Sequence, residues 1–283
     1  MGDEGTTLAG RRVLITGAAR GIGAATARRL HERGARVVLA GLEPDELASV
    51  AADCGDAAWW ECDVSDRERV EAVVAEAVDG LGGLDVVMAN AGIASQLPML
   101  GGDPGLFDKT VAVNLTGTYN TLRAAGPHIA HPRGYALAVA SLAAAVHPPL
   151  MAPYNASKAG VEALGDTLRI ELRPSGARVG VAYFAELDTD MTSRGFSTRA
   201  AHSLLRARPG NHVAPLEPAI DAIERGIARR SRRVVSPSWV RAVLPIRELA
   251  HRAVEVAVRR TAPKAIEIAL EETDVELTTP QPR

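Results

Sequence analysis

The amino-acid sequence predicts an α/β fold in which helices cover both faces of one doubly wound parallel sheet. Short apolar, β-branched runs alternate with helical segments along the chain, as a parallel sheet requires. The run 84–89 is apolar throughout, which is typical of a strand buried on both faces. A length of 283 residues, 47% of them apolar, is enough to bury one large core of this kind.

Each expected element follows from its local pattern. Strands are expected at the apolar runs 12–16, 36–40, 58–62, 84–89, 135–140, 178–184 and 233–235. Helices are expected over 24–33, from about 45, and over 67–78, about 104–130 and 153–172. Pro153 supports the last of these starts, because proline suits the first helical turn.

The chain is expected to form one domain with two flanking segments. We expect a disordered start over 1–7 and one α/β domain over 8–240, with a flap over the carboxyl ends of the strands at about 188–216. A C-terminal amphipathic helix and tail over 241–283 follow, because Ile246, Leu249 and Ala253 recur at helical spacing. Residues 271–283 are expected to be disordered. The helix could pack on the core, cover a partner subunit or lie on a membrane surface.

A glycine-rich turn follows the first strand and opens the first helix. Gly17 permits the tight turn, Gly21 allows backbone to approach a pyrophosphate, and Gly23 allows close helix packing. The helix N-terminus then offers free N–H groups to phosphates. The spacing G-x-x-x-G-x-G departs from the common G-x-G-x-x-G. An ordinary strand-to-helix turn is the alternative.

Tyr154 and Lys158 stand four residues apart in a predicted helix. Their side chains share one face, roughly 6 Å apart along the axis. A nearby cation lowers the pKa of a tyrosine by favouring the phenolate, so the pair could serve as a general acid/base. A solvated helix face is the alternative.

Together these motifs resemble the short-chain dehydrogenase/reductase family over about residues 8–235. The matching residues are Thr16-Gly17-(x)3-Gly21-Ile22-Gly23, Asp63-Val64, Asn90-Ala91-Gly92, Asn114, Ser141 and Tyr154-(x)3-Lys158. The resemblance implies a Rossmann-type fold and an NAD(P)-dependent enzyme that interconverts a secondary alcohol and a ketone by hydride transfer.

The resemblance also implies a role for each matching residue. Tyr154 would be the acid/base, Lys158 would lower its pKa and bond the nicotinamide ribose, and Ser141 would hold the substrate oxygen. Asn114 would kink its helix and hold a water for a proton relay. Asp63 would accept from the adenine amino group, although capping the next helix is its alternative role. The residues expected to bind cofactor are Gly17, Arg20, Gly21, Ile22, Gly23, Gly41, Leu42, Asp63, Val64, Asn90, Ala91, Gly92, Tyr154, Lys158, Leu187 and Thr189.

The choice between NAD(H) and NADP(H) depends on the end of the second strand. Gly41 occupies the usual acidic position and leaves room for a 2′-phosphate, and Arg20 supplies a cation. Glu43 argues the other way, because it could reach the ribose or repel the phosphate. The balance leans slightly to NADP(H).

The substrate end departs from the family pattern. Phe184-Ala185 replaces the usual Pro-Gly beside the nicotinamide, and a β-carbon and an aromatic ring there would reshape the pocket wall. Four flap arginines could receive an anionic substrate, with a solvated surface as the alternative: Arg194, Arg199, Arg206 and Arg208. An apolar pocket for a lipophilic alcohol or ketone is expected from Leu97, Pro98, Met99, Leu142, Pro148, Pro149, Leu150 and Met151.

Charge and cysteine content limit the remaining functions. A net charge of −2 argues against a general nucleic-acid binder. Cys54 and Cys62 match no metal-ligand pattern and favour a reducing, cytoplasmic location. We expect no metal, no transmembrane segment and a homodimer or homotetramer. A catalytically weak cofactor-binding regulator of the same fold is the alternative function. A sugar epimerase or dehydratase fits less well, because its glycine spacing differs.

Overall fold

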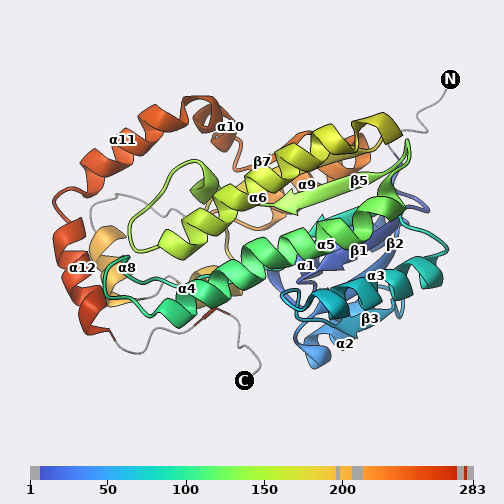
Figure 1. The fold of residues 1–283 in the computed structure, drawn as a ribbon, viewed down its shortest axis with the longest axis horizontal. Coiled ribbons are helices and arrows are strands. Elements are labelled where there is room, and N and C mark those ends of the chain that lie inside the picture. Colours follow the sequence, from blue (N-terminus) through green and yellow to red (C-terminus); the bar gives the residue numbers. More distant parts are fainter. Residues whose placement is uncertain (1–6, 196–197, 206–212, 273–276, 279–283) are drawn as a thin grey trace.

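In the computed structural model, seven parallel strands form one sheet with helices on both faces (Figure 1). The structure describes residues 7–195, 198–205, 213–272 and 277–278. The strands are β1 Arg12–Thr16, β2 Arg36–Gly41, β3 Trp59–Glu61, β4 Val86–Ala89, β5 Tyr135–Val139, β6 Arg178–Phe184 and β7 Arg233–Ser236. Their order across the sheet is β3-β2-β1-β4-β5-β6-β7. The predicted fold class is confirmed.

The helices connect these strands and extend past the last one. They are α1 Gly21–Glu32, α2 Pro44–Asp53, α3 Arg67–Leu81, α4 Pro104–Val111, α5 Gly117–Ala125, α6 Ala152–Glu171, α7 Asp190–Gly195, α8 Arg199–Leu205, α9 Glu217–Arg229, α10 Val240–Val243, α11 Arg247–Val258 and α12 Ala262–Glu271. Local signals set several ends. Asp66 caps α3 by accepting from the N–H of Arg69 at 3.1 Å, and Gly82 ends it at a φ of 70°.

Three helical regions differ from the sequence expectation. The helix expected over 104–130 is divided into α4 and α5 by a π-helical turn, Ala112–Thr116. Helices α7, α8 and α9 were not predicted. The C-terminal helix expected around 246–257 is present as α11, but the flanking helices α10 and α12 were not predicted; Pro245 precedes α11, and Pro263 stands in the first turn of α12.

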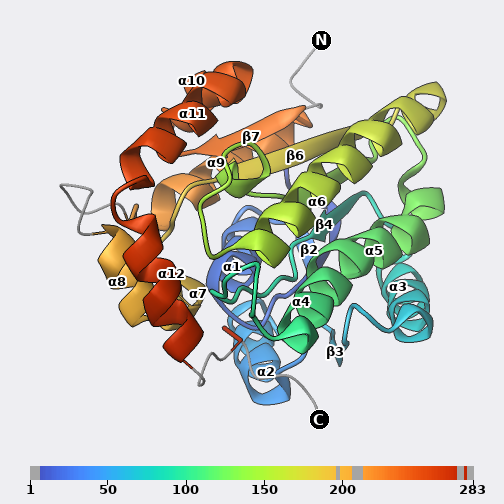
Figure 2. The same cartoon turned by 60° about the vertical axis from the view of Figure 1, so that its left-hand side comes forward.

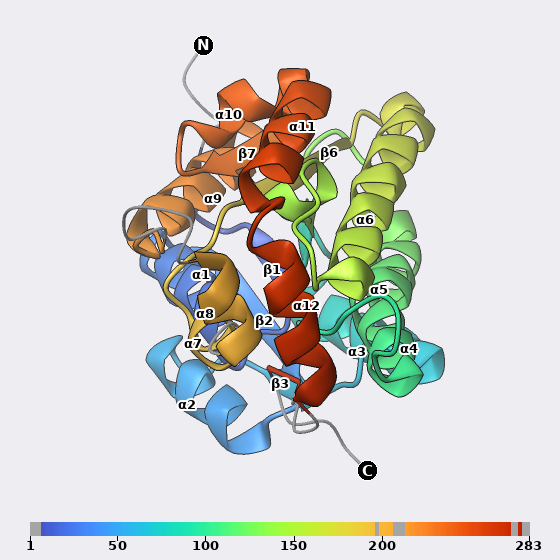
Figure 3. The same cartoon turned by 90° about the vertical axis from the view of Figure 1, so that its left-hand side faces the viewer.

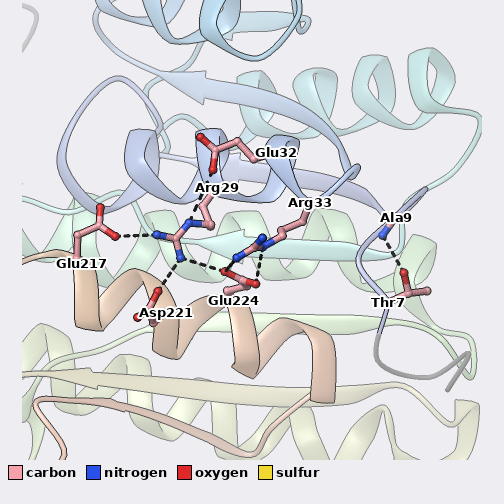
Figure 4. A network of polar contacts seen from close by, with 8 residues as sticks. All are labelled: Thr7, Ala9, Arg29, Glu32, Arg33, Glu217, Asp221 and Glu224. Carbon is pink, nitrogen blue, oxygen red and sulfur yellow. Dashed lines mark hydrogen bonds and ion pairs between the residues drawn. The ribbon is translucent and has the colours of Figure 1, made fainter.

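Two cores lie on opposite faces of the sheet. Helices α3, α5 and α6 pack over one face, whereas α1, α2 and α9 pack over the other (Figures 1 and 2). Ion pairs strengthen the second layer (Figure 4): Arg29 of α1 binds Asp221 at 2.6 Å and Glu224 at 3.0 Å on α9, and Arg33 binds Glu224 at 2.8 Å. The helix that follows the glycine turn is therefore anchored to the one before β7.

The C-terminal helices lie at one end of the molecule. Helix α12 packs beside α8, and α11 arches from α10 toward α12 (Figure 3). Within the described residues, no helix is both long and apolar enough to cross a bilayer. Of the tail expected to be disordered, Glu271 ends α12, and Glu272 accepts from the N–H of Arg199 at 2.8 Å. Leu277 packs on the core and Thr278 is 2% exposed, so the expectation is wrong for these four residues.

Candidate active site

A cavity of about 430 Å³ lies where the strand order reverses, between β1 and β4. In open parallel sheets, ligands bind in this crevice beyond the carboxyl ends of the strands. Its wall comes from the segments that follow β1, β2, β3, β4, β5 and β6, and from α6, α8 and α11. Of the expected site residues, Gly23 and Asn114 do not line the cavity but lie directly behind its wall.

The glycine turn is built for close backbone contact. Gly17 has a φ of +63°, and a β-carbon there would lie 2.7 Å from Cα of Ala91. A β-carbon on Gly23 would lie 2.2 Å from the carbonyl oxygen of Gly17. Only glycine fits either position. The turn delivers the N-terminus of α1 to the cavity, where its N–H groups fit a pyrophosphate.

Asn90 fixes the glycine turn against the end of β4. Its Nδ2 donates to the carbonyl oxygens of Thr16 and Gly17, both at 3.0 Å, and its own N–H donates to the Thr16 hydroxyl at 3.1 Å. The segment then continues to Gly92, where a β-carbon would lie 3.3 Å from Nζ of Lys158. One loop therefore contacts both the glycine turn and the polar groups of α6.

The ends of β2 and β3 supply the far end of the cavity. Gly41, Leu42, Asp63 and Val64 line it. Asp63 accepts from the N–H of Ser65 at 2.9 Å and pairs with Lys109 at 3.3 Å. The serine hydrogen bonds and the Lys109 ammonium hold the pKa of Asp63 below its usual range despite burial. Asp66 caps α3, so Asp63 is not required as the cap.

Arg20 is surrounded by carboxylates. Its guanidinium lies 2.7 Å from Glu43, 3.3 Å from Asp190 and 3.7 Å from Glu46. These acids hold the pKa of Arg20 above its usual value although burial opposes them. A phosphate would therefore compete with at least two close carboxylates for this cation.

Ser141, Tyr154 and Lys158 meet on the cavity wall at the end of β5. Ser141 starts a short 3₁₀ turn, and its hydroxyl donates to the Phe184 carbonyl at 3.3 Å. Lys158 is 3% exposed, and its Nζ donates to the Val139 carbonyl at 2.9 Å. That ammonium lies 5.6 Å from the centre of the Tyr154 ring. The i, i+4 spacing on α6 therefore brings phenol and ammonium together as expected.

Burial changes the pKa of both α6 groups. It raises the pKa of Tyr154, while a hydrogen bond with Ser141 acts in the opposite direction. Burial also lowers the pKa of Lys158 to about 8. Each neutral form is favoured because the charged form loses its hydration.

Asn114 occupies the π-helical turn and is fully buried. Its Oδ1 accepts from the N–H of Ile93 at 2.8 Å, and its Nδ2 donates to the Ile93 carbonyl at 2.9 Å and to Ser157 at 3.1 Å. This side chain joins the β4 loop to α6. The break in the long helix lies at the position where the sequence placed a kink.

The substrate end is apolar, but not from all the expected residues. Leu142, Pro148, Pro149 and Met151 line the cavity. Met99 is 73% exposed on the turn that follows Leu97, so its expected place in the pocket is wrong. Leu97, Pro98 and Leu150 are not part of the cavity wall either. Phe184 is 4% exposed and belongs to the core as well as to the wall.

Arg199, the flap arginine whose side chain the structure describes, does not line the cavity. Arg199 is 70% exposed and pairs with Glu272 at 3.5 Å. The side chains of Arg194, Arg206 and Arg208 lie outside the described residues. Leu187 and Thr189, which were expected to contact the nicotinamide carboxamide, both line the cavity.

Several wall residues were not foreseen as site residues. They include Gln96, Trp239, Val254, Val258 and Thr278. Val254 and Val258 belong to the amphipathic helix that the sequence did reveal, but its spacing does not say what the helix covers. Thr278 accepts at Oγ1 from the N–H of Ala94 at 3.0 Å, a contact across 184 residues without a local signal.

Comparison with known proteins agrees with this architecture. Residues 11–200 match the family model for short chain dehydrogenases. The chain is 34% identical over 224 residues to the cis-4-hydroxycyclohexanecarboxylate dehydrogenase of Sinomonas cyclohexanicum, covering 77% of this chain and 90% of that protein. It is 37% identical to the (−)-trans-carveol dehydrogenase of Rhodococcus erythropolis, covering 64% and 73%.

A solved structure shares the fold at similar length. A short chain dehydrogenase from Mycobacterium paratuberculosis, bound to NAD, superposes with a TM-score of 0.72 and 27% identity, covering 81% of this chain and 97% of that one. The family match spans more than half of the chain, and the strand order, glycine turn and cavity agree with it. The chain therefore belongs to the short-chain dehydrogenase/reductase family and is an NAD(P)-dependent oxidoreductase.

Proposed function

We propose that this enzyme interconverts a secondary alcohol and a ketone, with Tyr154 as the general acid/base. The observation that carries the proposal is the convergence of Ser141, Tyr154 and Lys158 on one wall of the cavity. The glycine turn lies in the same cavity, so a dinucleotide held there reaches this wall. The bound nicotinamide accepts or supplies the hydride.

The residues of the chain manage the proton and the position of the substrate. The Ser141 hydroxyl holds the substrate oxygen, and Tyr154 takes the proton from the alcohol or returns it to the ketone. Lys158, 5.6 Å from the Tyr154 ring, stabilises the phenolate when its amine is charged. It would also bond the nicotinamide ribose. Asn114 would hold a water that connects Lys158 to solvent; its hydrogen bonds to Ile93 and Ser157 support a fixed position beside that path.

The apolar wall at the substrate end supports a lipophilic substrate. Leu142, Val146, Pro149, Val254 and Val258 contribute hydrocarbon, and apolar pockets with a few polar groups favour such ligands. Two relatives are named for cyclic alcohols, a hydroxycyclohexanecarboxylate and carveol. We therefore place cyclic secondary alcohols first and sugars second for this chain.

The surroundings of Arg20 favour NAD(H) over NADP(H). The sequence leaned slightly to NADP(H), because Gly41 leaves space and Arg20 supplies charge. In the structure Glu43 lies 2.7 Å from that guanidinium, so a 2′-phosphate would have to displace a carboxylate. Glu43→Gln is expected to strengthen NADP(H) binding about tenfold, the size of removing one close charge, while NAD(H) affinity stays within about threefold.

The decisive experiment is a cofactor titration followed by an alcohol panel. We expect NAD(H) to bind more tightly than NADP(H), and cyclic secondary alcohols to reduce NAD⁺ faster than primary alcohols or sugars do. Tight NADP(H) binding by the parent protein would reverse the cofactor proposal. Turnover of sugars alone would reject the lipophilic substrate class.

A further inference from the structure

Helix α11 presents an apolar face to solvent in addition to the face on the cavity. At 3.6 residues per turn, Val254 and Val258 share the side that lines the cavity. Leu249, Ala253 and Val256 share another side, where Leu249 is 63% and Val256 is 73% exposed. No residue of α11 is buried. A helix of this length gains most of its stability from packing, and the exposed apolar side of α11 has room for a partner.

A stripe of charges runs beside the exposed apolar face. Glu248, Arg252, Glu255 and Arg259 follow one another at helical spacing, and all four are exposed. Their signs alternate as −, +, −, +. Reversing the direction of the helix turns this order into +, −, +, −, so the stripe is complementary to an antiparallel copy of itself.

We propose that α11 pairs antiparallel with α11 of a second copy of this chain. In one register Glu248 faces Arg259 of the other copy, while Arg252 faces Glu255. Both pairs are centred on the same point between Ala253 and Val254, so a single two-fold axis satisfies all four charges. An isologous contact of this kind is self-complementary by symmetry.

The apolar side chains fit the same register. Ala253 lies at the centre, where its small side chain lets the two helices approach, and Leu249 meets Ala257 and Val256 of the other copy. His251 interacts with Glu255 at 3.4 Å within the chain, and the pairing adds a cation from the other copy. A membrane surface fits less well, because the stripe carries equal numbers of both charges and an anionic bilayer would repel the glutamates.

The pairing completes the active site as well as the surface. Because α11 carries Val254 and Val258 on its other side, a second copy would hold this wall in place over the cavity. Within the chain the helix is attached near its start, where Arg247 binds Glu162 at 2.7 Å and His147 contacts His251 at 3.4 Å. A standard interface buries about 800 Å² per partner, more than one short helix supplies, so we expect the pairing to depend on concentration.

Exchanging charges across the proposed axis tests the pairing directly. In Arg252→Glu, the new glutamate of each copy faces Glu255 of the other copy. In Glu255→Arg, the new arginine of each copy faces Arg252 of the other copy. Both variants therefore place like charges opposite each other. At tens of micromolar, light scattering after gel filtration should show the mass of the parent assembly halved in each variant. An equimolar mixture of the two variants should return to the parent mass, because each glutamate then faces an arginine.

The mixture separates pairing from effects within one helix. Interactions of residues 252 and 255 in their own chain are unchanged by mixing, so only contact between copies explains recovery. The variants Glu248→Arg and Arg259→Glu, measured singly and then mixed, give an independent second test. The proposal is overturned if the parent is monomeric at these concentrations, if the single variants keep its mass, or if the mixture stays dissociated. Binding of a monomeric parent to phosphatidylserine vesicles would assign the face to a membrane.

Discussion

The cofactor end and the substrate end of the cavity are built in different ways. At the cofactor end, the Asn90 side chain holds two strand ends together, because its Nδ2 donates to the carbonyl oxygens of Thr16 and Gly17, both at 3.0 Å. At the substrate end, α11 has no buried residue and reaches the cavity through Val254 and Val258. The first end is fixed by the sheet, whereas the second is assembled from distant segments. A substitution at the substrate end should therefore leave the binding of the cofactor unchanged. A substitution at the cofactor end, in contrast, should also disturb the substrate end.

A β-carbon at the cofactor end should have the largest effect on binding. Gly23→Ala would place carbon 2.2 Å from the Gly17 carbonyl, so the turn must open and we expect cofactor affinity to fall by about a hundredfold or more, since it loses several phosphate contacts. Gly80→Ala is the matched control, because a β-carbon there meets nothing within 4 Å. It should leave affinity unchanged and stabilise α3 by about 1 kcal/mol. Calorimetric titration of both variants checks the contrast.

A larger side chain at the substrate end should spare the cofactor. Val254→Trp would fill part of the cavity from α11, so the KM for a bulky alcohol should rise about tenfold while cofactor affinity stays within about twofold. Ile170→Trp is the control, since Ile170 is 74% exposed on α6 and outside the cavity wall. Equal losses of cofactor affinity and substrate KM in Val254→Trp would contradict the independence of the two ends.

The sequence predicted the cofactor end better than the substrate end. Gly17, Gly23 and the Tyr154–Lys158 pair are local patterns, and their spacing requires a particular backbone. The position of Asn114 also predicted a disturbed helix, which is the π-helical turn.

The substrate end depends on contacts that have no local signature. Thr278 reaches Ala94 from the far end of the chain, and the same apolar spacing in α11 is compatible with packing on a cavity, a partner or a membrane. Met99 illustrates the limit, since an apolar side chain near the site faces solvent. The position of Asp190 beside Arg20 was also hidden, because the two residues lie 170 positions apart in the chain.

The buried ammonium of Lys158 should cost stability at neutral pH. Burial lowers its pKa to about 8, below the value of about 10.4 in an unfolded chain. The unfolded state therefore binds more protons between these values, and stability rises with pH across that window. Lys158→Met should be more stable than the parent at pH 7, by up to about 3 kcal/mol. Melting at pH 7 and pH 9.5 should show this advantage shrinking; an advantage that grew with pH would contradict the burial argument.

The most direct test of the account is the turnover of Tyr154→Phe beside its cofactor affinity. Removing one hydroxyl from the cavity wall should lower kcat by about a thousandfold, the usual range for an acid/base group, while NAD(H) affinity stays within about threefold. Tyr119→Phe, at a tyrosine 42% exposed on α5, should match the parent in both. Turnover of Tyr154→Phe within tenfold of the parent would contradict Tyr154 as the proton carrier.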